Sequence, residues 1–115
     1  MEMTITLAAY DKLKPYLDGK NKMLLSQDDG VGPFSKAGYC SLEVAFDIIA
    51  VKPMADTPDY QAVLKTNYGD WYYKDYTKSQ LDDNLKLDLK NNNLVLSGAS
   101  GILDNNVQLK DMTNV

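Results

Sequence analysis

Hydrophobic residues recur at every second position through most of this chain, a spacing that is typical of β-strands with one buried face. The clearest run spans Ser41 to Lys52, whose apolar residues on one face are Leu42, Val44, Phe46 and Ile48. Ile49 and Val51 then fall on the other face. This change predicts either a bulge or a strand that is buried on both sides near its end.

Shorter runs of the same kind predict further strands. They are Met3–Thr6, Lys22–Gln27, Gln61–Thr66, Asp70–Lys74, Leu85–Leu89, Leu94–Leu96 and Val107–Leu109. Three polar or glycine-containing segments predict tight turns between them, because Gly and Asn adopt positive φ readily: Asn67–Gly69, Asn91–Asn93 and Ser97–Gly101. We interpret 52–59, which contains two prolines, as a loop, and 77–81 as a single helical turn.

Only the segment after the first strand has helical spacing, with Leu7, Tyr10, Leu13 and Leu17 on one face. Thr6 is the expected N-cap, since its hydroxyl can accept a free backbone N–H of the first turn. Pro15 removes one intrahelical bond, so regular α-helix is expected to end near Lys14.

One helix followed by many short strands predicts an α+β fold that is mostly β. The single N-terminal helix would pack on a largely antiparallel sheet or a barrel-like β structure. With 115 residues and no linker, we expect a single domain over residues 1–115.

The composition excludes several kinds of chemistry. The chain has no His, its twelve basic residues are all Lys, and its only Cys is Cys40. One Cys cannot form an internal disulfide. Without His there is no Ser-His-Asp triad, so we do not expect an enzyme. A net charge of −4 argues against nucleic-acid and membrane partners, and the N-terminus shows no secretory signal. We therefore expect a cytoplasmic protein.

The segment from Asp28 to Cys40 is the candidate binding loop, since it is longer than a hairpin connection needs to be. Its candidate residues are Asp28, Asp29, Gly30, Gly32, Phe34 and Lys36. The Gly30–Gly32 pair lacks the Lys and helix of a phosphate-binding loop. A wide structural connection, flexible at its glycines and stiffened by Pro33, is the alternative interpretation.

Cys40 is the one candidate metal ligand. Two copies of the chain in a symmetric dimer would present two thiolates, with Asp28 or Asp29 supplying oxygen ligands. Alternatively, Cys40 is a small buried apolar residue. The acidic stretches Asp82–Asn84 and Asp104–Asn106 lack the ligand register of a calcium loop, and we interpret them as turns.

Five aromatic residues lie within nine positions: Tyr68, Trp71, Tyr72, Tyr73 and Tyr76. Strand alternation puts Trp71 and Tyr73 on one face and Tyr72 on the other. One face is expected to be core and the other an interaction surface, with Trp71 and Tyr72 as its candidate residues, because Tyr and Trp are enriched at interfaces. Cross-strand packing is the alternative.

The order of these segments resembles the HesB/IscA-like family of iron–sulfur cluster biogenesis proteins. The similarity rests on Ile5–Leu13, Gly30–Ser35, Tyr76–Asp88 and Leu96–Val107. It implies a HesB-like fold and a non-catalytic role in iron–sulfur cluster assembly, with iron or a cluster as the bound group. Family carriers use one Cys in the glycine-rich loop and a C-x-C pair near the C-terminus. Here Val31 or Gly32 takes the loop position, and residues 107–115 contain no Cys.

This divergence leaves two functional hypotheses. The chain is an assembly protein that holds iron or a cluster, or it is an interaction module that kept the scaffold and lost cluster binding. In either case we expect a protein partner or a homodimer.

Overall fold

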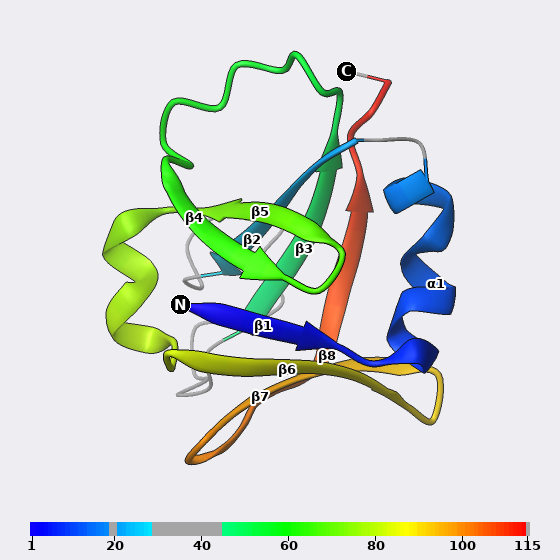
Figure 1. Ribbon diagram of the computed structural model, residues 1–115, viewed down its shortest axis with the longest axis vertical. Helices are drawn as coiled ribbons and strands as arrows, with labels where there is room; N and C mark the ends of the chain where they lie inside the picture. The colour runs from blue at the N-terminus through cyan, green and yellow to red at the C-terminus, as the bar shows by residue number, and fades with distance from the viewer. Residues whose placement is uncertain (19–20, 29–44, 115) are drawn as a thin grey trace.

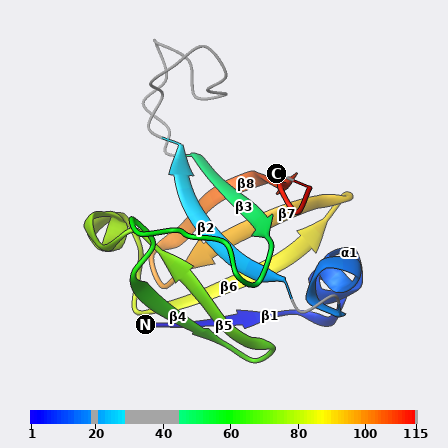
Figure 2. The ribbon, with the colours of Figure 1, turned by 90° about the horizontal axis from the view of Figure 1, so that it is seen from above.

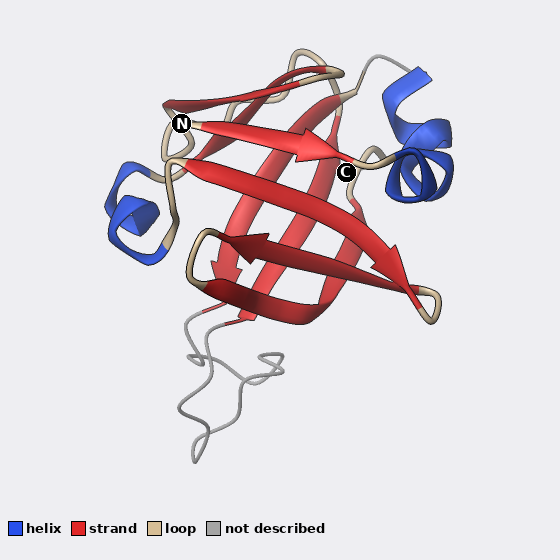
Figure 3. Ribbon diagram, turned by 60° about the horizontal axis from the view of Figure 1, so that its bottom comes forward, coloured by secondary structure: helices blue, strands red, loops and turns tan. Residues whose placement is uncertain are grey.

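The computed structural model describes residues 1–18, 21–28 and 45–114, and in these residues eight strands close into a barrel (Figure 1). The elements in chain order are β1 (Glu2–Ile5), α1 (Leu7–Asp18), β2 (Lys22–Asp28), β3 (Ala45–Val51), β4 (Ala62–Thr66), β5 (Gly69–Tyr73), the 3₁₀-helix η1 (Asp75–Gln80), β6 (Asn84–Lys90), β7 (Asn93–Gly98) and β8 (Gly101–Asp111). Figure 3 shows α1 and η1 on opposite sides of the barrel. The predicted α+β fold, mostly β with one N-terminal α-helix, is confirmed.

The strands follow the order β1-β4-β5-β2-β3-β8-β7-β6 around the barrel. Four neighbouring pairs are antiparallel, namely β2–β3, β4–β5, β6–β7 and β7–β8. The other four are parallel, namely β1–β4, β1–β6, β2–β5 and β3–β8. The barrel-like alternative is thus confirmed, but the sheet is mixed and not largely antiparallel, because the parallel pairs join strands that are distant in sequence.

Strand β1 closes the barrel by lying between β4 and β6. Its pairing with β4 is short, with the Cα partners Glu2–Lys65 and Met3–Thr66. Beyond it, the side chain of Asn67 continues the ladder. The N–H of Ile5 donates to Asn67 Oδ1 at 2.8 Å, and Asn67 Nδ2 donates to the Ile5 carbonyl at 3.0 Å. One side-chain amide thus replaces a peptide group of β4.

Alternate side chains of the strands fill the barrel with a single hydrophobic core. The largest fully buried members include Trp71, Phe46, Leu64 and Leu87. In β3 four consecutive residues, Ala45 to Ile48, are buried, and the register with β2 runs without a break. Of the two alternatives for this strand, burial on both sides is the one observed, and it occurs at the start of β3 and not at its end.

Helix α1 packs on the barrel through Ala9 and Leu13, both of which are fully buried. The predicted N-cap is confirmed, since the N–H of Ala9 donates to Thr6 Oγ1 at 3.3 Å. The prediction that the helix ends near Lys14 is wrong: α1 continues through Pro15 to Asp18. Tyr16 and Leu17 pack against the core, and this burial outweighs the single hydrogen bond that Pro15 removes.

Strand β8 begins at Gly101, earlier than predicted, and includes Asp104 to Asn106. The interpretation of these three residues as a turn is therefore wrong. They lie where the register between β7 and β8 is irregular. Asp104 stabilises this irregularity, because its two carboxylate oxygens accept the N–H groups of Phe46 at 2.8 Å and Asn106 at 2.9 Å.

Replacing Asn67 with Asp tests how much the closure depends on this amide. A carboxylate can accept the Ile5 N–H but cannot donate to the Ile5 carbonyl, so the two oxygens repel each other. We expect Asn67→Asp to lower the free energy of unfolding by about 1–3 kcal/mol. Urea denaturation measures this loss. Asn92→Asp, the same change at the exposed β6–β7 turn, is the control, and an equal effect of both substitutions would contradict the role of Asn67.

Acid sensitivity provides a second test. Asp88 Oδ1 accepts the N–H of Leu89 at 2.8 Å and the hydroxyl of Thr6 at 2.9 Å. These hydrogen bonds, the Leu89 one foremost, hold the pKa of Asp88 below 3.8. Because the pKa is lower in the folded state, ionised Asp88 stabilises the fold above the unfolded-state pKa. This stabilisation is lost as the pH falls through the folded-state pKa.

We therefore expect Asp88→Asn to lose less stability than the unmodified protein between pH 7 and pH 3. Thermal unfolding at several pH values measures the difference. Asp59→Asn, at an exposed position between β3 and β4, is the control. If Asp88→Asn and the unmodified protein show the same pH dependence, Asp88 does not contribute.

Candidate functional site

The candidate binding loop is attached at one end of the barrel. Asp28 is the last residue of β2 and Ala45 the first of β3, and the two are Cα partners in the antiparallel pair (Figure 2). The described part of the loop is therefore the backbone of Asp28. Six of the predicted site residues lie outside the described residues: Asp29, Gly30, Gly32, Phe34, Lys36 and Cys40.

The donor atoms of one chain do not fit a complete iron–sulfur cluster. Such clusters are held by thiolates, or in some centres partly by imidazoles, and the sequence contains one Cys and no His. Within the described ranges, no group of three or more His, Cys, Asp or Glu residues is placed to hold a metal ion. One chain therefore supplies a single thiolate of the several that a cluster usually takes.

The aromatic residues of β5 divide between the two sides of the barrel wall. Trp71 and Tyr73 point inward and are 1% and 4% exposed. Trp71 is therefore a core residue, and its assignment to an interaction surface is wrong, because strand alternation turns it into the barrel. Tyr72 points outward and is half-buried. On the outer surface of this hairpin, Tyr72 therefore lies opposite its cross-strand neighbour Val63.

Outside the barrel, residues 52–61 connect β3 to β4 and form a strap over β2. Two hydrogen bonds attach it: Lys22 Nζ donates to Thr57 Oγ1 at 2.5 Å, and the Tyr60 hydroxyl donates to Ser26 Oγ at 3.0 Å. Leu24 lies between these two attachment points on the same outer face. It is 2% exposed although it is not part of the barrel core.

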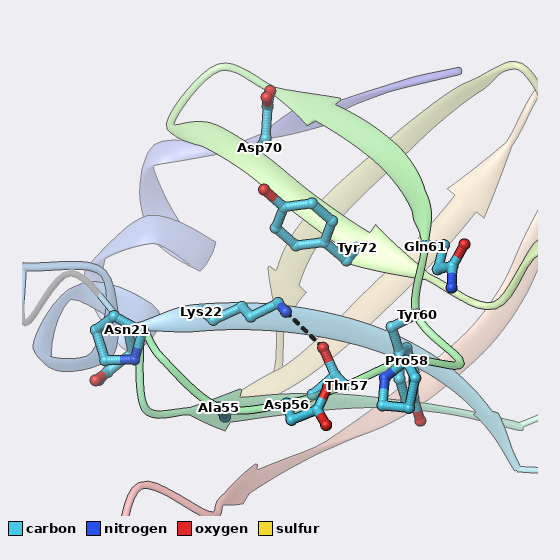
Figure 4. A pocket seen from close by; sticks show the side chains of 11 residues that line it. Asn21, Lys22, Ala55, Asp56, Thr57, Pro58, Tyr60, Gln61, Asp70 and Tyr72 are labelled. Atoms are coloured by element: carbon cyan, nitrogen blue, oxygen red, sulfur yellow. Dashed lines mark hydrogen bonds between the residues drawn. The ribbon is translucent and has the colours of Figure 1, made fainter.

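A cavity of about 590 Å³ opens between the strap and the outer face of β2 and β5 (Figure 4). Lys22 and Tyr72 line it from the barrel, and Asp56, Thr57 and Tyr60 line it from the strap. The Lys22 ammonium lies 5.2 Å from the centre of the Tyr72 ring. Sequence reasoning missed this site, because Lys22, Tyr72 and the loop 52–59 lie in three separate segments and nothing in the sequence shows that they meet. The two prolines of the loop are the only local feature that sets this segment apart.

The comparisons with known proteins agree with the fold. The family model for iron-sulphur cluster biosynthesis matches residues 1–111 of this chain. The chain belongs to this family. In the described part of this chain, no helix is long and apolar enough to cross a membrane.

Two solved structures resemble this family member closely. One is a "putative Fe-S biosynthesis protein" from Lactobacillus salivarius, described as having a novel protein fold. It shares 41% identity and a TM-score of 0.82, with 98% of this chain and 99% of that one covered. The other is a "putative Fe-S biosynthesis protein" from Lactobacillus acidophilus, with 26% identity, a TM-score of 0.72, and 96% and 90% covered. No curated protein matches this chain.

Truncating Trp71 and Tyr72 separates the core side chain from the surface one. We expect Trp71→Ala to reduce the free energy of unfolding by about 3–5 kcal/mol, because it leaves a large cavity in the core. Tyr72→Ala, the matched truncation on the outer face, should cost clearly less. Denaturant unfolding measures both. Equal losses of unfolding free energy would contradict the assignment of Trp71 to the core and of Tyr72 to the outer face.

Proposed function

We propose that this protein takes part in iron–sulfur cluster assembly without being a catalyst, and that it holds iron or a cluster only together with a second protein chain. One observation carries the proposal: this chain belongs to an iron–sulfur cluster biosynthesis family, yet it has a single thiol, that of Cys40. Two chains supply two such thiolates, and a partner with its own cysteines supplies more. A homodimer or a complex with another assembly protein is therefore the expected working form.

The absence of His and Arg supports a non-catalytic role. Neither a neutral-pH imidazole base nor a guanidinium is available to a reaction. The net charge of −4 favours protein partners over nucleic acids or anionic membranes. The cytoplasm is the proposed compartment, because it keeps an unpaired thiol reduced.

An interaction module that no longer binds a cluster is the second candidate. The missing ligands favour it, since one chain provides one thiolate where a cluster needs several. Both candidates predict that the protein changes the rate at which another protein receives its cluster. They differ in whether Cys40 is required for that effect.

Anaerobic reconstitution with iron and sulfide distinguishes the two candidates. If the protein shares a cluster between chains, it becomes coloured with about one cluster for two chains, which is the stoichiometry that two Cys40 thiolates imply. The visible absorbance should disappear in Cys40→Ser, while circular dichroism shows that this variant remains folded. Equal absorbance in Cys40→Ser would contradict the role of the thiol.

A loading assay tests the assembly role itself. An apo-ferredoxin is supplied with iron and sulfide, and the growth of its absorbance is followed with and without the protein. We expect a changed loading rate. A change that persists in Cys40→Ser supports the interaction module, and an unchanged rate with the unmodified protein would overturn both candidates.

A further inference from the structure

The cavity under the strap contains an ammonium group that has no carboxylate partner among residues 1–18, 21–28 and 45–114. In the part of the chain that the structure describes, the contacts of Lys22 Nζ are the Thr57 hydroxyl and the face of the Tyr72 ring. The ion pairs formed by the described residues, Lys86–Asp88 and Lys110–Asp47, do not include it. Lys22 is half-buried and lines the cavity, so its ammonium group is available to an anion that enters there.

Asp70 also lines the cavity, but it does not pair with Lys22. Leu24 and Tyr72 are Cα partners in the parallel pair β2–β5, and Lys22 and Asp70 lie two residues before this pairing, on the same outer face of their strands. The Lys22 side chain nevertheless extends toward Thr57. In Figure 4 the side chain of Tyr72 lies between those of Lys22 and Asp70. The cavity therefore has a positive and a negative group on either side of one aromatic side chain.

Uncharged hydrogen-bond donors accompany the ammonium. Thr57 Oγ1 accepts a hydrogen bond from Lys22, so its own proton remains available for a ligand. The Tyr72 hydroxyl and the Gln61 amide also line the cavity, and neither forms a hydrogen bond to the described residues. Thr57 can therefore donate to an anion that Lys22 holds, and Tyr72 and Gln61 offer further donors elsewhere in the cavity.

The charges around the cavity select among anions. Asp56 and Asp70 are exposed and line the same cavity, and the whole chain carries a net charge of −4. A phosphate, with its higher charge, is repelled more strongly by these carboxylates than a single carboxylate is. A ligand that also carries an ammonium group avoids this repulsion, because its positive charge is attracted to the carboxylates of Asp56 and Asp70.

We propose that this cavity binds the carboxylate of an amino acid, with Lys22 as its anchor and Tyr72 beneath it. The carboxylate belongs either to a free zwitterionic amino acid or to the C-terminus of a polypeptide. In the first case the exposed carboxylates of Asp56 and Asp70 attract the α-ammonium group, and in the second they do not take part. This site is independent of Cys40 and of cluster binding, so either proposal can fail without the other.

Four probes separate these sources in ¹H–¹⁵N NMR titrations of the full chain: leucine, leucinamide, N-acetyl-leucine and a tetrapeptide that ends in a free Leu carboxylate. Leucine should shift the amide signals of Thr57, Gln61 and Tyr72, whereas leucinamide, which lacks the carboxylate, should not. Weak binding of N-acetyl-leucine and the tetrapeptide would identify the free amino acid, and binding equal to that of leucine would identify a chain terminus.

Lys22→Met keeps the aliphatic length of the side chain and removes its charge. It should weaken binding of the preferred probe by about tenfold, which is the usual contribution of a charge-assisted hydrogen bond. Lys14→Met, at an exposed position of α1, is the matched control and should bind normally. Tyr72→Phe removes the Tyr72 hydroxyl and keeps the ring. It tests whether this hydroxyl contributes to binding while the Lys22–Thr57 hydrogen bond stays in place.

Three results would overturn the proposal. The first is that leucinamide binds as well as leucine, and the second is that no probe shifts these signals at millimolar concentration. Inorganic phosphate is included as a further probe, and tighter binding of phosphate than of leucine would also contradict it. Thermal unfolding of each variant establishes that a loss of binding does not come from loss of the fold.

Discussion

The barrel depends on β1, a strand of four residues with a parallel neighbour on each side. If β1 were absent, β4 and β6 would both be open edges, and such edges invite pairing with other chains. The pairing of β1 with β4 is short, and the Asn67 amide extends it by two hydrogen bonds to Ile5. A single side chain thus supports the closure that keeps the core dry.

The sequence predicted what local patterns determine. Thr6 caps the helix as expected, and the asparagines at the β6–β7 turn take positive φ at Asn91 and Asn92. Long-range partners were not predictable in this way. Asn67 was interpreted only as a turn residue and Asp104 was assigned to a turn, yet each side chain hydrogen-bonds a backbone about 60 residues away. Nothing in the adjacent residues signals such partners.

The same limit applies to the candidate site. Alternation correctly placed Tyr72 opposite Trp71, but could not decide which face was the core until the barrel was known. The cavity requires Lys22, Thr57 and Tyr72 to meet from three separate segments, and only the parallel β2–β5 pairing brings two of them together. By contrast, the thiol count is a property of composition. This count limits the number of thiolate ligands that one chain can supply to a cluster, whatever the position of the candidate loop.

The position of β1 in the chain also affects how the protein is made. Its partners in β4 and β6 follow it in the chain by about 60 to 80 residues. No local hairpin pairs with it, so its apolar residues Met3 and Ile5 remain without their final neighbours until β4 and β6 have been synthesised. The barrel therefore cannot close before residues that are distant in sequence are present.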